Sequence, residues 1–134
     1  MKIGIIGGNS KVSVELALLL RAKGHEVIPV VRNKKATAFL AHNGFDYRVA
    51  DPTDSDETER AAYGLDSIVV AAYAGIGARD ITDYREAWNI NSAIVRNSIN
   101  KSPERATVIY FSSIAAFGNS LYDSLFRGRL DPYS

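Results

Sequence analysis

The sequence predicts an α/β fold, in which a doubly wound parallel sheet lies between two helical layers as a three-layer αβα arrangement. Residues 1–32 have the pattern of a strand, a glycine-containing turn, a helix and a second strand, and short apolar runs then alternate with helical patterns. The continuous apolar run at 66–72 (DSIVVAA) is typical of a strand buried on both faces, and we expect it to be central. A chain of 134 residues suits one domain, residues 1–134.

The first βαβ unit suggests a phosphate-bearing ligand. We predict a strand at 1–6, a tight turn at 7–10, a helix at 12–23 and a second strand at 27–31. The start of such a helix leaves backbone N–H groups without intrahelical partners, and the helix dipole adds partial positive charge. A pyrophosphate could therefore bind at this turn. The candidate contacts there are Gly7, Asn9, Ser10, Lys11 and Val12.

The glycine pattern of this turn is incomplete. In a G-x-x-G-x-x-G turn the first glycine allows the bend, the second lets the pyrophosphate approach the backbone, and the third lets helix and strand pack closely. Those places hold Gly7, Ser10 and Ser13 here. Ser10 could still donate a hydroxyl to a phosphate, and Ser13 is small enough to pack under the helix. The alternative is that Gly7 and Gly8 form an ordinary βα turn.

The remaining elements continue the alternation. We expect helices at 34–42, 53–64 and 84–100 and strands at 45–49, 66–72 and 106–112. Thr53 or Asp54 would cap the second of these helices. Right-handed crossovers then make the simplest strand order 3-2-1-4-5. The strand ends near Arg32, Asp51 and Ser113 would meet at one edge, where such folds bind ligands.

Composition and charge exclude several classes of function. The formal net charge is +1, so we expect neither nucleic acid nor a membrane surface as a partner. The chain has no cysteine, and no apolar run approaches ~20 residues, which suggests a soluble, cytoplasmic protein. His25 and His42 have no neighbour at ligand spacing, and the acidic stretch 54–59 suits a helix start, so we expect no metal site.

The end of the second strand suggests which dinucleotide would bind. An acidic residue there favours NAD, whereas an arginine accommodates the 2′-phosphate of NADP. Here Arg32 and Asn33 are followed by Lys34 and Lys35, with no carboxylate. We therefore expect Arg32 and Asn33 to contact the cofactor and NADP to be favoured over NAD. The alternative is that these cations only begin a surface helix.

With these residues in place, the chain resembles the extended short-chain dehydrogenase/reductase family, the NAD(P)-dependent epimerase/dehydratase group, in its N-terminal Rossmann portion. The strongest matches are VIYFSSIAAFG at 108–118 and DPYS at 131–134, which look like the family's S-S-x-x-x-Y-G and the start of its Y-x-x-x-K motif. Further residues match cofactor-lining positions of the family: Asp51, Pro52, Ala71, Ala72, Tyr73, Asn91 and Ser112.

The resemblance implies hydride transfer with a tyrosine as acid/base, acting on a nucleotide sugar or a similar carbonyl or alcohol substrate. By match, Ser113 would hydrogen-bond the reacting oxygen and Tyr133 would exchange the proton. For each residue an ordinary role remains open: Ser113 as a turn residue, Tyr133 as a terminal residue, and Asn91 as a solvated helix residue.

The lysine of the family's catalytic motif is missing, because no tyrosine in this sequence has lysine at the fourth following position. The family's catalytic set is therefore incomplete, and we expect a truncated, N-terminal part of a longer enzyme. Two alternatives remain open. One is a non-catalytic dinucleotide-binding module, such as a redox-sensing regulator, and the other is an interaction domain without nucleotide. The helix at 84–100 could supply the face of a homodimer.

Overall fold

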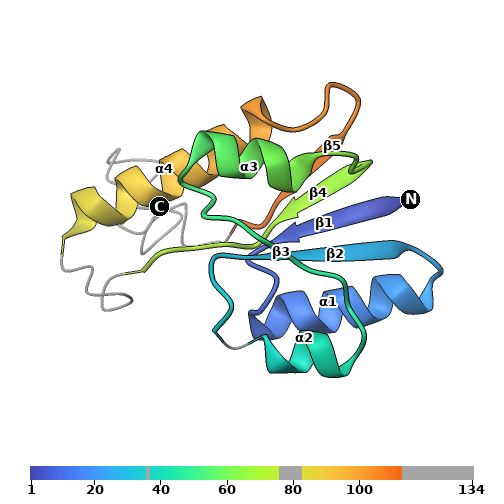
Figure 1. The fold of residues 1–134 in the computed structure, drawn as a ribbon. Helices are drawn as coiled ribbons and strands as arrows, with labels where there is room; N and C mark the ends of the chain where they lie inside the picture. The colour runs from blue at the N-terminus through green and yellow to red at the C-terminus, as the bar shows by residue number, and fades with distance from the viewer. Residues whose placement is uncertain (36, 76–82, 113–134) are drawn as a thin grey trace, which may run out of the picture.

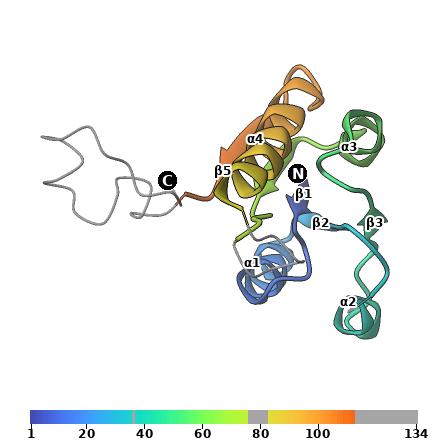
Figure 2. The same ribbon diagram turned by 90° about the vertical axis from the view of Figure 1, so that its left-hand side faces the viewer.

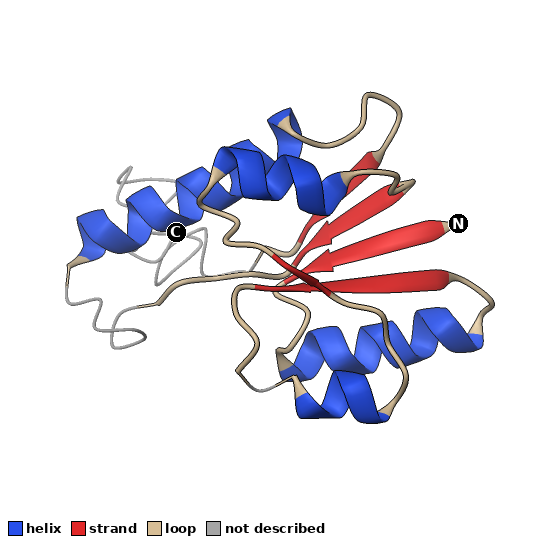
Figure 3. Cartoon of the chain, viewed as in Figure 1, coloured by secondary structure: helices blue, strands red, loops and turns tan. Residues whose placement is uncertain are grey.

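Five parallel strands form the centre of the molecule. The computed structural model describes residues 1–35, 37–75 and 83–112. The strands lie in the order β3-β2-β1-β4-β5, and every neighbouring pair is parallel (Figures 1 and 3). They are β1 (Lys2–Ile6), β2 (Glu26–Val31), β3 (Arg48–Val49), β4 (Ser67–Val70) and β5 (Thr107–Tyr110). The predicted order 3-2-1-4-5 is confirmed.

Helices cover both faces of this sheet. Helices α1 (Lys11–Ala22) and α2 (Ala38–His42) lie on one face, and α3 (Ser55–Ala62) and α4 (Tyr84–Asn100) lie on the other (Figures 1 and 2). The predicted doubly wound, three-layer fold is therefore confirmed. β4, which we expected to be a central strand, lies inside the sheet between β1 and β5, and all four of its residues are buried.

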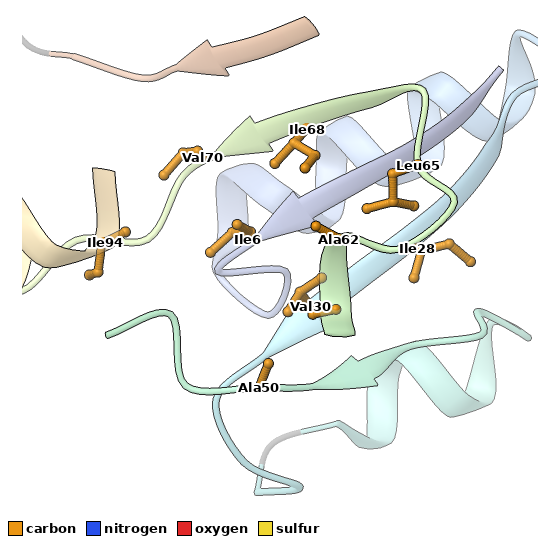
Figure 4. Close-up of a cluster of buried hydrophobic side chains, with 10 residues drawn as sticks. Ile6, Ile28, Val30, Ala50, Ala62, Leu65, Ile68, Val70 and Ile94 are labelled. Atoms are coloured by element: carbon orange, nitrogen blue, oxygen red, sulfur yellow. The ribbon is translucent and has the colours of Figure 1, made fainter. Parts of the chain in front are cut away.

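The strand periodicity divides the core into two clusters. On β1, Ile3 and Ile5 belong to the cluster on the α1 and α2 side, whereas Ile6 belongs to the cluster on the α3 and α4 side. On β4, Val69 likewise faces the first helical pair, and Ile68 and Val70 face the second (Figure 4). Alternate side chains of an inner strand thus enter opposite cores, which explains the uninterrupted apolar run.

Two predicted elements are shorter than expected. The helix expected at 34–42 begins only at Ala38, because the Asn33 side chain accepts from the Lys35 amide and the Thr37 hydroxyl donates to the Lys34 carbonyl, each at 2.9 Å. Such side-chain bonds hold a turn in competition with the helix. The strand expected at 45–49 contains only two residues. Phe45 is buried in the core beneath the Arg21 guanidinium, which lies 4.0 Å from its ring centroid.

Candidate functional site

A pocket of about 240 Å³ lies at the carboxyl ends of the first four strands. These ends point to the left in Figure 1 and toward the viewer in Figure 2. Gly7 and Asn9 line the pocket from the turn after β1, and Ala72 and Tyr73 line it from the segment after β4. The remaining walls come from the segments after β2 and β3 and from Ile94 on α4. The pocket therefore occupies the edge where the topology predicts a ligand.

Gly7 brings the turn after β1 into contact with the end of β4. Its φ is +86°, a left-handed value, and a Cβ built on it would lie 2.7 Å from the Ala72 amide nitrogen. Its amide and that of Gly8 donate to the Val30 carbonyl at 3.0 and 2.9 Å. No side chain fits at Gly7 without displacing the backbone just after β4. Both amides are consumed by the fold and are not offered to a ligand.

Gly8 is a structural requirement that the sequence reasoning missed. A Cβ there would lie 2.5 Å from the Pro29 Cβ and 2.8 Å from its Cα. The turn can therefore pack onto β2 only with glycine at this place. The signal that could have identified it was the Gly7-Gly8 pair itself, since a turn that bends once needs only one glycine.

Ser10 and Ser13, which stand at the two missing glycine places, bond to each other. Ser10 is the N-cap of α1, and its Oγ accepts from the Ser13 amide at 3.2 Å. The two hydroxyl oxygens lie 2.7 Å apart, and either can donate. Ser13 is completely buried, as its small size predicted. The capping bond orders the helix start, where the amides of Lys11 and Val12 have no intrahelical partner.

The start of α1 also keeps its positive charge. Its first turn contains no acidic residue, and its cap is a neutral serine. The first turns of α3 and α4 contain carboxylates, at Asp56 and Glu57 and at Glu86, which offset the dipole there. Unlike α3 and α4, α1 thus combines a position at the pocket edge with free amides and a dipole that no carboxylate offsets.

The pocket wall after β2 is cationic. Arg32, Asn33 and Lys35 line it, and all three are exposed. The bond from the Lys35 amide to the Asn33 side chain holds this turn in place. Lys34 is not in the lining, and no carboxylate occurs among the residues that line this pocket in the described part of the chain.

Hydrogen bonds from several elements hold the wall after β3. Ala50 and Pro52 line the pocket, and Asp51 lies between them without being part of the lining. The Asp51 Oδ1 accepts from the Thr53 amide and hydroxyl at 2.9 and 2.7 Å, and the Asp51 amide donates to Glu57 Oε2 at 2.7 Å. One carboxylate oxygen of Asp51 thus closes a turn.

On the opposite wall, Asn91 of α4 holds the segment after β4. Its Oδ1 accepts from the Ala74 amide and its Nδ2 donates to the Ala74 carbonyl, both at 2.9 Å. The interpretation of Asn91 as merely a solvated helix residue is therefore wrong. Ala71 continues the sheet by donating to the Ile6 carbonyl at 2.9 Å. Together these bonds place Ala72 and Tyr73 at the pocket.

The structure brings only some of the predicted residues into this pocket. Gly7, Asn9, Arg32, Asn33, Pro52, Ala72 and Tyr73 line it. Lys11 and Val12 lie beside it at the start of α1, and Ser112 is exposed just after β5. The predicted catalytic pair, Ser113 and Tyr133, lies outside the described residues.

The described residues contain neither a candidate metal-ion site nor a membrane-spanning helix. Residues 1–35, 37–75 and 83–112 contain no group of three or more His, Cys, Asp or Glu side chains arranged to hold a metal ion. In the same ranges, no helix combines the length and the apolar character needed to cross a membrane.

Comparison with protein families identifies the ligand class. A family model described as NAD(P)H-binding matches residues 7–123, which include the whole pocket. The chain belongs to this NAD(P)H-binding family. No curated protein matches the sequence. The pocket and the start of α1 both lie within the matched residues of this NAD(P)H-binding chain.

Solved structures share the fold of this NAD(P)H-binding chain. A putative NAD-dependent epimerase/dehydratase from Bacillus halodurans is 25% identical, with a TM-score of 0.69 over 88% of this chain and 54% of that chain. UDP-N-acetylglucosamine 4-epimerase from Bacillus cereus is 19% identical, with a TM-score of 0.70 over 90% of this chain and 43% of that one. A short-chain dehydrogenase/reductase superfamily protein from Agrobacterium tumefaciens with bound NAD is 15% identical, with a TM-score of 0.71 over 88% and 34%.

These comparisons confirm the predicted resemblance to short-chain dehydrogenases/reductases of the epimerase/dehydratase type. The chain matches between 34% and 54% of the length of the three solved structures.

Proposed function

We propose that this NAD(P)H-binding chain uses NADP, with the adenosine half in the pocket and the pyrophosphate at the start of α1. The observation that carries the proposal is the wall after β2, where Arg32 and Lys35 line the pocket and no carboxylate does. A guanidinium can hold a 2′-phosphate through two parallel hydrogen bonds, and a lysine adds charge. A carboxylate that would select the ribose 2′-OH of NAD is missing from this wall.

The rest of the pocket fits an adenosine. Ala50, Pro52 and Ile94 supply apolar surface for a planar base, and Asp51 stands next to it as a carboxylate acceptor. The resemblance to the epimerase/dehydratase group implies that this acidic residue meets the adenine amino group. The cofactor would then continue past Gly7 and Asn9 toward Ala71, Ala72 and Tyr73, with Asn91 holding that wall.

The serine pair can supply a hydrogen bond to the pyrophosphate. When the buried Ser13 hydroxyl donates to Ser10 Oγ, the Ser10 proton is left for an anion beside the free amides of Lys11 and Val12. Ser10 thus contributes a donor at the place where the family's second glycine only allows close approach. The missing glycine is in this way compatible with dinucleotide binding.

The catalytic proposal concerns the longer enzyme of which this domain would be the cofactor-binding part. Bound NADP would supply hydride acceptance and donation at a carbinol or carbonyl carbon. Ser113 and Tyr133 would orient the reacting oxygen and exchange its proton, on a nucleotide sugar or a related substrate. The second candidate is a non-catalytic dinucleotide-binding module. It is favoured by one observation, that serine stands at the second and third glycine places of the turn after β1, at Ser10 and Ser13.

Calorimetric titration with NADPH and NADH tests the cofactor proposal. We expect NADPH to bind about 10- to 100-fold more tightly, since charged hydrogen bonds to the 2′-phosphate are worth about 1.5–3 kcal/mol. Arg32→Ala should remove most of this preference and leave NADH affinity nearly unchanged. Equal affinities in the unaltered protein would contradict the choice of NADP, and no binding of either cofactor at millimolar concentration would contradict dinucleotide binding by this chain.

The reading frame beyond Ser134 separates the two candidate functions. A lysine four residues after Tyr133, followed by further α/β sequence, supports the enzyme. A stop codon directly after Ser134 supports the non-catalytic module.

A further inference from the structure

Asn97 joins two walls of the pocket. Its side chain is buried, with 9% exposed, and its Nδ2 donates to the Pro52 carbonyl at 3.1 Å and to the Thr53 carbonyl at 2.9 Å. Pro52 lines the pocket from the segment after β3, and Ile94, one turn before Asn97 on α4, lines it from the other side. One amide group therefore couples the positions of two pocket-lining residues that belong to different elements.

The other bonds to this segment come from its own βα unit. Thr58 of α3 donates to the Pro52 and Asp54 carbonyls at 3.4 and 2.6 Å, and Glu57 of the same helix accepts from the Asp51 amide. Within the described ranges, Asn97 is the one side chain from outside that unit with a hydrogen bond to residues 51–54. Without its amide, the Thr53 carbonyl loses its only side-chain donor in those ranges, and the segment loses its attachment to α4.

A single face of α4 makes the contacts on both sides of the pocket. Asn91, Ile94 and Asn97 follow one another at intervals of three residues, so they lie on one side of the helix. Asn91 forms two hydrogen bonds with the Ala74 backbone. Ile94 lines the pocket and belongs to the apolar cluster drawn in Figure 4. Asn97 donates to the Pro52 and Thr53 carbonyls. α4 is thus hydrogen-bonded both to the segment after β3 and to the segment after β4.

We propose that Asn97 is a positioning residue for the adenine base, acting through Pro52 and the neighbouring Asp51. The inference rests on the proposed function, because it assigns the base to this end of the pocket. The Asn97 amide holds the Asp51 turn at a set distance from Ile94, so that the base packs against the apolar wall while its exocyclic amino group meets an acceptor. Recognition of the amino group requires the Asp51 turn to stay at this distance from Ile94, whereas a loosely held turn would accept other bases equally well.

The test compares NADPH with its hypoxanthine counterpart, in which a carbonyl oxygen replaces the exocyclic amino group. Both dissociation constants are measured by calorimetry for the unaltered protein and for Asn97→Ala. A loss of folded protein raises both apparent constants by the same factor, so their ratio reports positioning and not stability. We expect the unaltered protein to prefer adenine and Asn97→Ala to reduce that preference by about fivefold or more.

Two further variants complete the test. Asn100→Ala, on the same helix, removes an exposed amide that has no side-chain hydrogen bond in the described residues, and it should keep the normal ratio. Asn97→Ser preserves a small polar side chain, should fold if the alanine variant does not, and should show the same reduced ratio. An unchanged ratio in a folded Asn97 variant overturns the inference and leaves the proposed function intact. Failure of the unaltered protein to bind either nucleotide overturns both.

Discussion

The three glycine places of the turn after β1 meet different physical demands. Gly7 needs both a left-handed φ and the absence of a Cβ, because the Ala72 backbone lies against it. The other two places tolerate serine, since Ser10 caps α1 and Ser13 fits completely buried beneath it. The turn therefore keeps its geometry with serine at these two places.

Substitution of Gly7 should separate conformational strain from close packing. Gly7→Ala forces a left-handed φ and inserts a Cβ 2.7 Å from a backbone nitrogen, so we expect a loss of about 2–4 kcal/mol in the free energy of unfolding. Gly24→Ala is the matched control, since Gly24 has a φ of +85° but nothing within 4 Å of the added Cβ. It should cost only about 1–2 kcal/mol. Equal losses in urea denaturation would show that the contact with Ala72 contributes nothing.

At the scale of the element, capping side chains set the boundaries that periodicity leaves open. α4 spans 84–100 as predicted, after the cap Asp83. α3 begins after Asp54, one of its two candidate caps, because Asp54 Oδ1 accepts from the amides of Asp56 and Glu57 at 2.9 and 2.8 Å. α2 is shorter than predicted because side-chain bonds at Asn33 and Thr37 hold a turn before it.

Removal of the α3 cap should weaken both the helix and the pocket wall beside it. Asp54→Ala leaves two amides without their acceptor, and we expect a loss of about 0.5–2 kcal/mol in the free energy of unfolding. Asp54→Asn retains an acceptor oxygen and should lose less. Chemical denaturation of the three proteins measures the difference. A larger loss for asparagine than for alanine would contradict the capping role.

For the whole molecule, the parallel sheet gathers residues from across the sequence at one edge. Gly7, Arg32, Pro52 and Tyr73 follow four different strands and line one pocket, although they span much of the chain. The match of residues 7–123 to the NAD(P)H-binding family agrees with a binding site assembled in this way. The homodimer face on α4 stays a prediction.

Cofactor binding should stabilise the whole fold. A ligand that binds only the native state at 100 times its dissociation constant adds about 2.7 kcal/mol to the free energy of unfolding. For a domain of this size, we expect NADPH to raise the melting temperature by roughly 10 °C. NADH at the same concentration should raise it less, because fewer molecules would be bound. Thermal melts followed by circular dichroism measure both shifts, and the absence of a shift with NADPH would contradict native-state binding.

The sequence by itself determined the succession of strands and helices, the strand order and the edge at which the site lies. These follow from short-range periodicity and from the right-handed crossover, which hold for any chain of this pattern. It also identified Gly7 and Arg32 as pocket residues, because each comes directly after a strand.

Only the tertiary structure decided which polar side chains support that edge. Asn97 reaches a carbonyl 45 residues earlier in the chain, and Gly8 is required by Pro29 on the neighbouring strand. The tertiary structure also places Lys35 in the pocket lining and Lys34 outside it. Such relationships depend on distances between segments that are far apart in sequence, and no local pattern encodes those distances.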